Sequence, residues 1–475
     1  VDYSLFYLRR VREERAAGRP ALGAVDAAAA TSGRSVLVSG LTVLIAMAGM
    51  FITGQGTFIG MAEATVTVVA VAVLGSLTVL PATLAALGDR VEKGRIPWLG
   101  KRLQARREQG PSRFWTRVLR PVLAHPAISA AVATAALLVL AAPALSLHTG
   151  ILSASQELPH NVALMKTYDR LQRAFPGGPT PARVVVSAPN VNAPRVVTEL
   201  ADLRSRALAS GQMSQPITVD VNPRHTVAVL NIPLAGDGRN RASRDALKTL
   251  RDTLIPATVG RVATAHVMGD TATSTDFNAR LKARAPFVIA FVLALAFVLL
   301  VVSFRSLVIA ATGLALNLLS VSAAYGVLVA VFQWGWGRSV LSLSSTGVIA
   351  GWLPLFLFVI LFGLSMDYHV FSVSRIKEEH DRGAATRTAI HDGIVRSAGV
   401  ITSAAIIMVL VFLTFATLSQ TSMKQLGVGL AIAVLLDATI VRAVLLPSVM
   451  ELLGERNWGT RRHSRRAAAV GAEAA

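Results

Sequence analysis

The sequence predicts a polytopic α-helical membrane protein, with about eight full transmembrane helices plus a partial one, and one α/β domain outside the membrane. The chain has 475 residues, of which 53% are hydrophobic and 16% are charged. Soluble domains average about 45–50% apolar and about 25% charged residues. Eight apolar runs approach the ~20 residues that a helix needs to cross ~30 Å of hydrocarbon. One long polar segment, residues 148–285, separates the third run from the fourth.

The predicted spans are the longest stretches with few or no charged residues. They cover residues 35–53, 64–87, 127–147, 286–303, 307–332, 353–373, 399–417 and 426–449. Residues 1–8 are too few to cross the bilayer, so we interpret them as the end of a partial helix.

Lysine and arginine are concentrated in four segments, which are residues 9–19, 88–126, 375–396 and 450–475. When the spans alternate across the membrane, all four segments fall on one side, which predicts that this side is cytoplasmic. The simplest role for these arginines is to orient helices and contact anionic lipid headgroups. The predicted parts are the end of an N-terminal transmembrane half (1–87), a basic cytoplasmic linker (88–126), a single helix (127–147), an extracytoplasmic domain (148–285), a five-helix bundle (286–449) and a basic cytoplasmic tail (450–475).

Composition and motifs argue against several other classes of function. The net charge of +20 could indicate nucleic acid as a partner, but no zinc-finger, RNA-binding or Gly-rich phosphate motif accompanies the basic residues. The chain has no Cys, so it can form neither a disulfide nor a thiolate metal site. No nucleophile–base set and no metal-ligand spacing stands out. We therefore expect neither enzyme activity nor a bound cofactor or metal.

The long polar segment has the pattern of a folded α/β domain. Its predicted strands and helices, in chain order, are residues 183–187, 194–209, 217–222, 226–232, 241–254 and 265–268. This β-α-β-β-α-β order is the split βαβ, or ferredoxin-like, arrangement. A helix is also predicted ahead of it, over residues 161–175. After the last strand, a turn at residues 269–271 should begin a helix that continues into the next span and couples the domain to the membrane.

Two acidic residues lie where lipid is expected. Asp367 and Tyr368 fall in the middle of the span 353–373, and the same pair begins the chain as Asp2 and Tyr3. An Asp at the centre of a membrane helix costs about 2.5–3.5 kcal/mol on insertion scales, so such residues are usually functional. A static polar lock between helices is the alternative. Because the pair is duplicated, we favour a group that takes up and releases protons in a transporter driven by a proton gradient.

The duplicated pair belongs to a longer internal repeat. Residues 2–6 (DYSLF) match residues 367–371 (DYHVF), and residues 10–14 (RVREE) match residues 375–379 (RIKEE). Near the end of each copy, LGDR at 87–90 matches LGER at 453–456, so the offset changes only from 365 to 366. Each copy contains one partial helix, an amphipathic stretch and two spans in the same orientation. This predicts a parallel repeat about an axis along the membrane normal.

These runs resemble a known family. GLSMDYHVF at 363–371 with SRIKEE at 374–379, NLLSV at 317–321 and LDATIVR at 436–442 are similar to the MMPL (mycobacterial membrane protein large) transporters of the resistance-nodulation-division superfamily. The resemblance covers essentially the whole chain. It implies two six-helix halves, each with an external porter domain, and proton-powered export of lipids or other hydrophobic molecules. On that pattern the chain starts within the fourth helix, so we expect an N-terminally truncated fragment whose partner is the missing N-terminal half or a second copy.

The predicted relay residues are Asp367, Tyr368, Asp2 and Tyr3. Burial favours the neutral form of Asp367, which makes it the proton acceptor. Tyr368 and Tyr3 are expected to hydrogen-bond to the carboxylate on the opposite helix. His369 is a candidate supporting group, although it projects about 100° away from Tyr368 around the helix.

Asp437 and Arg442, in the last span, are the other supporting candidates. Five residues apart on an α-helix, they should face different sides and not pair with each other. Arg442 is expected to extend its charge toward the membrane surface, and Asp437 to contact another helix. Functional and structural roles fit these two residues equally well.

Two other classes share the expected layout. One is a proton-coupled accessory of protein export similar to SecD and SecF. The other is a non-transporting lipid- or sterol-sensing membrane scaffold, in which the Asp–Tyr pairs would be dispensable.

Overall fold

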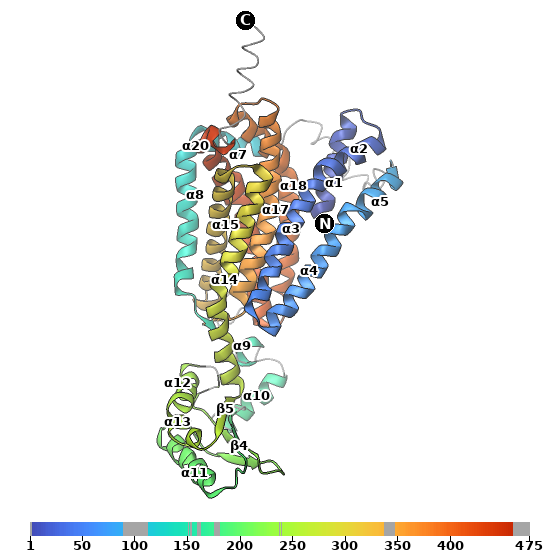
Figure 1. The fold of residues 1–475 in the computed structure, drawn as a ribbon. Helices are drawn as coiled ribbons and strands as arrows, with labels where there is room; N and C mark the ends of the chain where they lie inside the picture. Colours follow the sequence, from blue (N-terminus) through green and yellow to red (C-terminus); the bar gives the residue numbers. More distant parts are fainter. Residues whose placement is uncertain are drawn as a thin grey trace.

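The structure is a computed structural model that describes residues 2–88, 113–150, 152, 154–158, 163–174, 181–236, 238, 240–336 and 347–458. It is a long helical bundle with an α/β domain at one end (Figure 1). We call the end of the bundle that carries this domain the domain end, and the opposite end the far end.

The helices of the first part lie at one side of the bundle. They are α1 (Asp2–Ala16), α2 (Ala21–Ala28), η1 (Ala29–Gly33), α3 (Arg34–Ala48), η2 (Gly49–Thr53), α4 (Gly56–Leu77) and α5 (Val79–Leu87). The second span was predicted to begin at residue 64, but α4 already begins at Gly56. The prediction was wrong because the apolar run starts later than the helix that contains it.

The remaining helices form the body of the bundle. They are α7 (Arg113–Ala124), α8 (Pro126–Ala141), η4 (Ala142–Ser146), α14 (Asp270–Phe304), α15 (Leu307–Leu328), η7 (Val329–Gln333), α17 (Leu353–Asp381), α18 (Thr386–Phe415), α19 (Thr421–Leu436), η8 (Asp437–Leu445), α20 (Leu446–Leu453) and η9 (Gly454–Trp458). Among the described residues, eight helical stretches are long and apolar enough to cross a membrane; six contain a predicted span entirely, and the other two end one or two residues before theirs.

The sequence repeat is also a repeat of helix boundaries. Helices α1 and α17 end 365 residues apart, at Ala16 and Asp381. Helices α2 and α18 begin at the same offset, and so do α4 and α19. Packing follows the same relation, because α17 lies along α3 while α1 contacts α18. Helices α1 and α17 are therefore equivalent elements of two copies.

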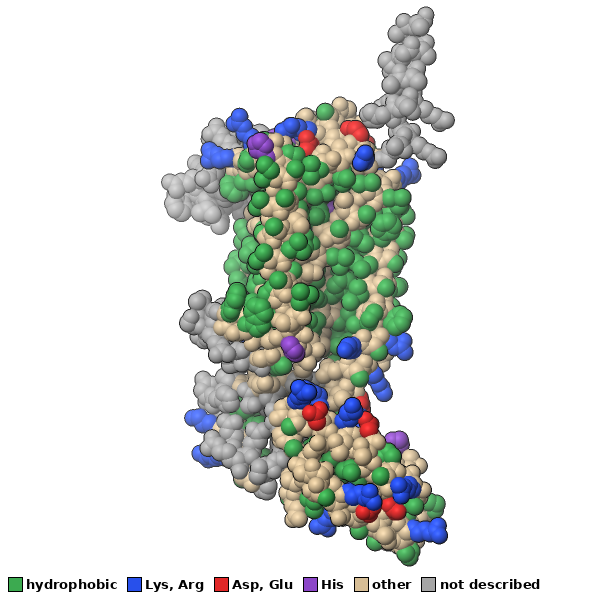
Figure 2. Space-filling model, turned by 90° about the vertical axis from the view of Figure 1, so that its left-hand side faces the viewer, with side chains coloured by type: hydrophobic (Ala, Val, Ile, Leu, Met, Phe, Trp, Pro, Cys, Tyr) green, Lys and Arg blue, Asp and Glu red, His purple; other side chains and the backbone are tan. Residues whose placement is uncertain are grey.

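Helix α17 is the central element of the bundle. In its most apolar stretch, 82% of the residues are buried. In the corresponding stretches of Gly56–Leu87 and Pro126–Ser146, only 11% of the residues are buried. On the face seen in Figure 2, hydrophobic side chains cover the bundle between its ends, and charged side chains gather at the far end and on the domain. A charged group on α17 is therefore surrounded by protein, whereas the outer helices present apolar side chains to lipid.

Glycines allow some helices to approach closely. A Cβ added at Gly326 of α15 would overlap the carbonyl oxygen of Leu140 in α8. We expect Gly326→Ala to destabilise the fold by about 1–3 kcal/mol, because the two backbones must separate. Gly75→Ala in α4 is the matched control, since nothing lies within 4 Å of that Cβ, and it should be neutral or slightly stabilising. Chemical denaturation in detergent measures both; an equal effect of the two variants would contradict this packing.

The α/β domain has the predicted order of elements. Its strands and helices are β2 (Ala182–Ser187), α11 (Pro194–Ala209), β3 (Thr218–Val221), β4 (Val227–Ile232), α12 (Arg241–Thr249), η5 (Leu250–Leu254), α13 (Ile255–Ala257), η6 (Val259–Arg261) and β5 (Thr264–Met268), preceded by α9 (Ala154–Glu157) and α10 (Ala163–Ala174). The strands pair in the order β3-β4-β2-β5, each pair antiparallel. The helices pack on one face of the sheet through Leu203 and Leu247, which meet Val184 and Leu230.

Two connections join the domain to the bundle. Helix α14 begins directly after β5 and continues without a break into the membrane part, as predicted (Figure 1). The chain entering the domain forms β1 (Thr149–Gly150), which pairs in parallel with β6 (Ile349–Ala350) just before α17. Gln425 of α19, which is fully buried, accepts from the backbone N–H of Ala350 at 2.9 Å. The domain is thus attached to the helices that surround α17.

Candidate functional site

The predicted relay position lies at the centre of α17. Ser365 precedes Asp367 by two residues, and Tyr368 and His369 follow it on the same helix. The side chains of Asp2, Tyr3 and Asp367 lie outside the part of the chain that the structure describes. The predicted contacts of each Tyr with the opposite carboxylate therefore stay predictions.

Tyr368 is buried between α17 and α18. Its hydroxyl donates to Sδ of Met408 at 3.4 Å, and its side chain joins an apolar cluster with Phe371 and Ile401. Leu5 of α1 packs against the same cluster. Because Leu5 is only three residues from Asp2, the two copies of the Asp–Tyr sequence lie on helices that meet at this cluster.

Asp437 and Arg442 form a buried ion pair, which corrects the sequence-based prediction. The Nε of Arg442 lies 2.9 Å from Oδ2 of Asp437, and Nη2 lies 2.7 Å from the same oxygen. Each residue is 5% exposed. The prediction assumed an α-helix, but η8 is a π-helix, whose i→i+5 pattern brings residues five apart to one face. Pro447, which follows η8 and has no backbone N–H, was the one local signal of irregular helix geometry.

Arg442 points into the bundle and not toward the membrane surface, which is a second correction. Its Nη2 donates to the backbone oxygen of Ser365, and its guanidinium lies over the ring of Tyr368, 5.1 Å from the centroid. The partner of Asp437 that the structure describes is Arg442, and not a group on another helix as predicted. The ion pair therefore places the Arg442 guanidinium against α17, at Ser365 and Tyr368, which lie on either side of Met366 and Asp367.

A small cavity lies beside this ion pair. Its polar lining comes from three helical segments and consists of Asn317, Ser320, Ser365, Tyr368 and Asp437. Among the described residues, Oδ1 of Asn317, Nε2 of His369, Oγ of Ser372 and Nη1 of Arg442 are buried polar atoms without a hydrogen-bond partner. Buried polar atoms are normally satisfied by protein or water. These four atoms lie on or beside α17, and five further atoms of the same kind lie elsewhere in the described residues.

His369 lies on a different side of α17 from Arg442. It is 6% exposed, and its Nε2 is so close to α15 that a Cβ added at Gly313 would lie 2.6 Å away. The structure thus brings together Tyr368, Asp437 and Arg442, while His369 faces α15. Asn317 and Tyr325 of α15 donate hydrogen bonds to the backbone oxygens of Phe362 and Pro354 and so join α15 to α17.

Comparison with known proteins identifies the relatives of this chain. The sequence profile of the MMPL family matches residues 1–129 and 156–470. The chain belongs to the MMPL family. It is 39% identical over 470 residues to the mycolic acid-containing lipids exporter MmpL11 of Mycolicibacterium smegmatis, covering 96% of this chain and 48% of that protein. It is therefore a member of the resistance-nodulation-division superfamily and a membrane protein.

Two further relatives come from Mycobacterium tuberculosis. The heme uptake protein MmpL11 is 37% identical, over 96% of this chain and 47% of its own length. The trehalose monomycolate exporter MmpL3 is 31% identical, over 98% of this chain and 52% of its own length. The MMPL chain described here thus spans about half the length of the curated relatives it matches.

Among solved structures, the fold is similar to that of SecDF in its super-membrane-facing form. The TM-score is 0.53 at 14% sequence identity, over 100% of this chain and 54% of that one. This similarity shows a shared fold. The sequence relationship assigns the chain to the MMPL family and not to the SecD and SecF class considered above.

Proposed function

We propose that this MMPL chain is part of a proton-driven exporter of lipids or other hydrophobic molecules across the cytoplasmic membrane. The lipid cargo is supported by the names of two relatives, which describe exporters of mycolic acid-containing lipids and of trehalose monomycolate. The proton drive is supported by one observation above all. A buried cation, Arg442, is held by Asp437 against the backbone and ring of the residues flanking Asp367.

The mechanism follows from charge in a medium of low dielectric constant. An ionised carboxyl at position 367 is attracted to nearby positive charge far more strongly than it would be in water. A proton taken up by this carboxyl neutralises it and removes the attraction, and its release restores the attraction. Helices α1 and α17, which meet at the cluster of Leu5 and Tyr368, can then shift relative to one another.

We take the α/β domain to be a ferredoxin-like, extracytoplasmic porter domain. Helix α14, which is continuous from this domain into the bundle, can transmit the movement to it. Arg251 of η5 forms two hydrogen bonds with Asp276 of α14, at 2.7 and 2.9 Å, and its Nη2 also donates to the backbone oxygen of Val267 in β5. Asp276 lies ten residues before the apolar run that begins at Pro286, and the Arg251 guanidinium lowers the pKa of Asp276 from its ordinary value. The lowered pKa favours the ionised form of Asp276, which is the form that binds Arg251.

Breaking this contact should uncouple the domain from the bundle. We expect Asp276→Asn to slow cargo transport several-fold, while proton uptake by the bundle continues, because only one end of the linkage is changed. Transport of a labelled lipid and proton uptake are measured on the same proteoliposomes. Arg206→Gln is the matched control, since Arg206 pairs with Asp202 inside α11 alone. Equal losses of transport and proton uptake in Asp276→Asn would contradict a coupling role.

The proposed function is tested by lipid transfer in liposomes with an imposed pH gradient. Transfer of a fluorescent long-chain lipid should require the gradient and should stop when a protonophore collapses it. Heme serves as a second cargo, because one relative carries the name of a heme uptake protein. Lipid transfer that is equal with and without the gradient would overturn the proton drive, and transfer no faster than in protein-free liposomes would favour the non-transporting scaffold.

A further inference from the structure

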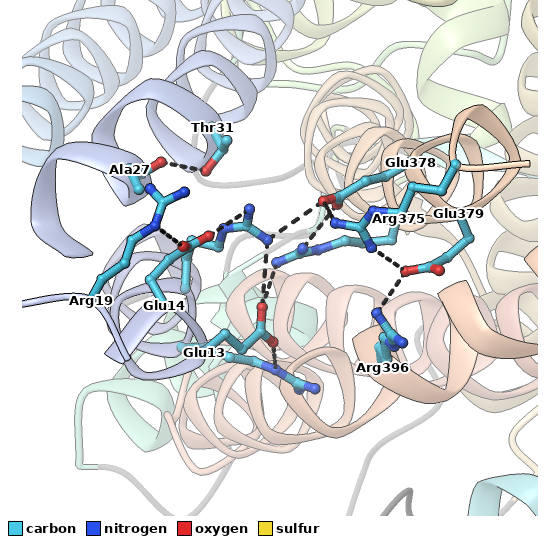
Figure 3. Close-up of polar contacts among 12 residues, drawn as sticks. Glu13, Glu14, Arg19, Ala27, Thr31, Arg375, Glu378, Glu379 and Arg396 are labelled. Carbon is cyan, nitrogen blue, oxygen red and sulfur yellow. Dashed lines mark hydrogen bonds and ion pairs between the residues drawn. The ribbon is translucent and has the colours of Figure 1, made fainter. Parts of the chain in front are cut away.

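Four charged side chains at the far end form a reciprocal set across the two repeats. Arg10 and Glu13 of α1 are the repeat mates of Arg375 and Glu378 of α17, each 365 residues apart. Nη1 of Arg10 lies 3.6 Å from Oε1 of Glu378, and Nη2 of Arg375 lies 3.3 Å from Oε2 of Glu13. Figure 3 labels Glu13, Arg375 and Glu378 of this set and marks polar contacts with dashed lines. Each arginine thus pairs with a glutamate on the other helix, and in the repeat that glutamate is equivalent to the one three residues after the arginine.

The same four residues are also paired within their helices. Arg10 lies 3.7 Å from Glu13, and Arg375 lies 3.1 Å from Glu378. Arg10 additionally binds Glu14 at 2.8 Å. We call Arg10, Glu13, Arg375 and Glu378 the charge ring, since its charges alternate in sign around a closed set of contacts. The side chains of both arginines are largely buried, at 13% and 16% exposure.

The charge ring lies between the relay positions and the far end. Arg10 and Arg375 each follow an Asp of the repeat by eight residues, which is about 12 Å along a helix. An apolar layer that includes Leu5, Phe371 and Ile401 separates the two levels. The guanidinium of Arg375 covers this layer, 5.6 Å from the centroid of the Phe371 ring. A proton moving from position 367 toward the far end would meet the apolar layer first and then the ring.

We propose that the charge ring is the gate through which relay protons reach the far end, and that it is closed in this structure. This inference rests on the proposed function. With the cross-repeat pairs closed, two guanidinium groups occupy the route and repel a proton, while their carboxylate partners are held in place. When α1 and α17 shift, the cross-repeat pairs separate and the two guanidinium groups withdraw from the route of a proton from the relay level, while Glu13 and Glu378 keep Arg9 and Arg382 as partners on their own helices.

Separating the cross-repeat pairs costs little free energy, because each arginine also has a carboxylate partner on its own helix. The cross-repeat pairs include distances of 3.3 and 3.6 Å, whereas Arg10–Glu14 and Arg375–Glu378 are at 2.8 and 3.1 Å. After separation, each arginine keeps a partner on its own helix, so no buried charge is left alone. A pair that can open without orphaning a charge is suited to repeated movement, unlike the locked Asp437–Arg442 pair.

The test exchanges charges on one helix at a time. Arg10→Glu with Glu13→Arg keeps opposite charges at positions 10 and 13 but places like charges opposite both partners on α17, and also beside Glu14 and Arg9 within α1. We expect this variant to leak protons several-fold faster than the wild type in liposomes without cargo, measured with an internal pH dye and a potassium ionophore. Adding Arg375→Glu and Glu378→Arg restores opposite charges across the repeats and should lower the leak again, although like charges within each helix remain. Arg396→Gln is the control, because Arg396 binds Glu379 outside the ring.

The outcomes separate the gate from the relay. A leak that disappears when Asp367→Asn is added supports the proposal, since the protons then pass through the relay. A leak that persists in that background, or a folded α1 exchange variant without any leak, overturns it while leaving the proposed function intact. Unchanged proton uptake in Asp367→Asn alone overturns the proposed function and the gate together. If the exchange variant does not fold, Glu378→Gln, which removes one acceptor, should show a smaller leak, and its absence also overturns the gate.

Discussion

Asp367→Asn is expected to abolish gradient-driven transport, reducing it to the level of protein-free liposomes. Asn has nearly the same size and shape as Asp but cannot take up or release a proton near neutral pH. The helix and its packing should therefore remain, while the response to the pH gradient is lost. Lipid transfer and proton uptake, both measured on reconstituted protein, test this expectation.

The matched control for this variant is Asp381→Asn. Asp381 is the last residue of the same helix and is exposed at the far end, so the same substitution there should leave transport unchanged. Equal rates of transport in the Asp367 variant and the wild type, at equal protein levels, would refute the relay.

Removing one partner of the Asp437–Arg442 pair is expected to cost about 3–5 kcal/mol of unfolding free energy, because the other charge is left buried and unpaired. Arg442→Met and Asp437→Asn should each show this loss. The double variant Asp437→Leu with Arg442→Met should recover most of it, since both charges are then absent. Denaturant unfolding in detergent measures the three variants.

The exposed Arg206–Asp202 pair of α11 provides the control for this cycle. An exposed pair on a helix surface contributes little because solvent screens it, so Arg206→Met should have little effect on stability. We further expect the double variant Asp437→Leu with Arg442→Met to fold but to lose gradient dependence, because the cation beside Tyr368 is gone. If both single variants were as stable as the wild type, the buried pair described here would be contradicted.

Local patterns in the sequence predicted most of the fold. The eight spans, the order of elements in the α/β domain and the continuous α14 depend on the length and periodicity of apolar residues, which a single sequence contains. The boundaries were less accurate, because helices such as α17 and α18 continue through charged residues beyond the apolar run. For α4, the helix begins eight residues before the predicted span at position 64.

The site contacts depend on geometry that periodicity does not contain. The pairing of Asp437 with Arg442 requires the π-helical form of η8, and an α-helical wheel places the two residues apart. The charge ring could have been foreseen in part, because RVREE and RIKEE match across the repeat and a parallel repeat brings equivalent helices together. The missing information was which ends of α1 and α17 meet, and this depends on packing between elements far apart in the sequence.

The most direct test of the central claim is difference infrared spectroscopy of the reconstituted protein during a pH step. Our account predicts a carbonyl band of a protonated carboxyl that appears and disappears with the pH gradient and is missing in Asp367→Asn. A band that is present and unchanged in Asp367→Asn, or no gradient-dependent carboxyl signal in the active wild type, would contradict proton exchange at position 367.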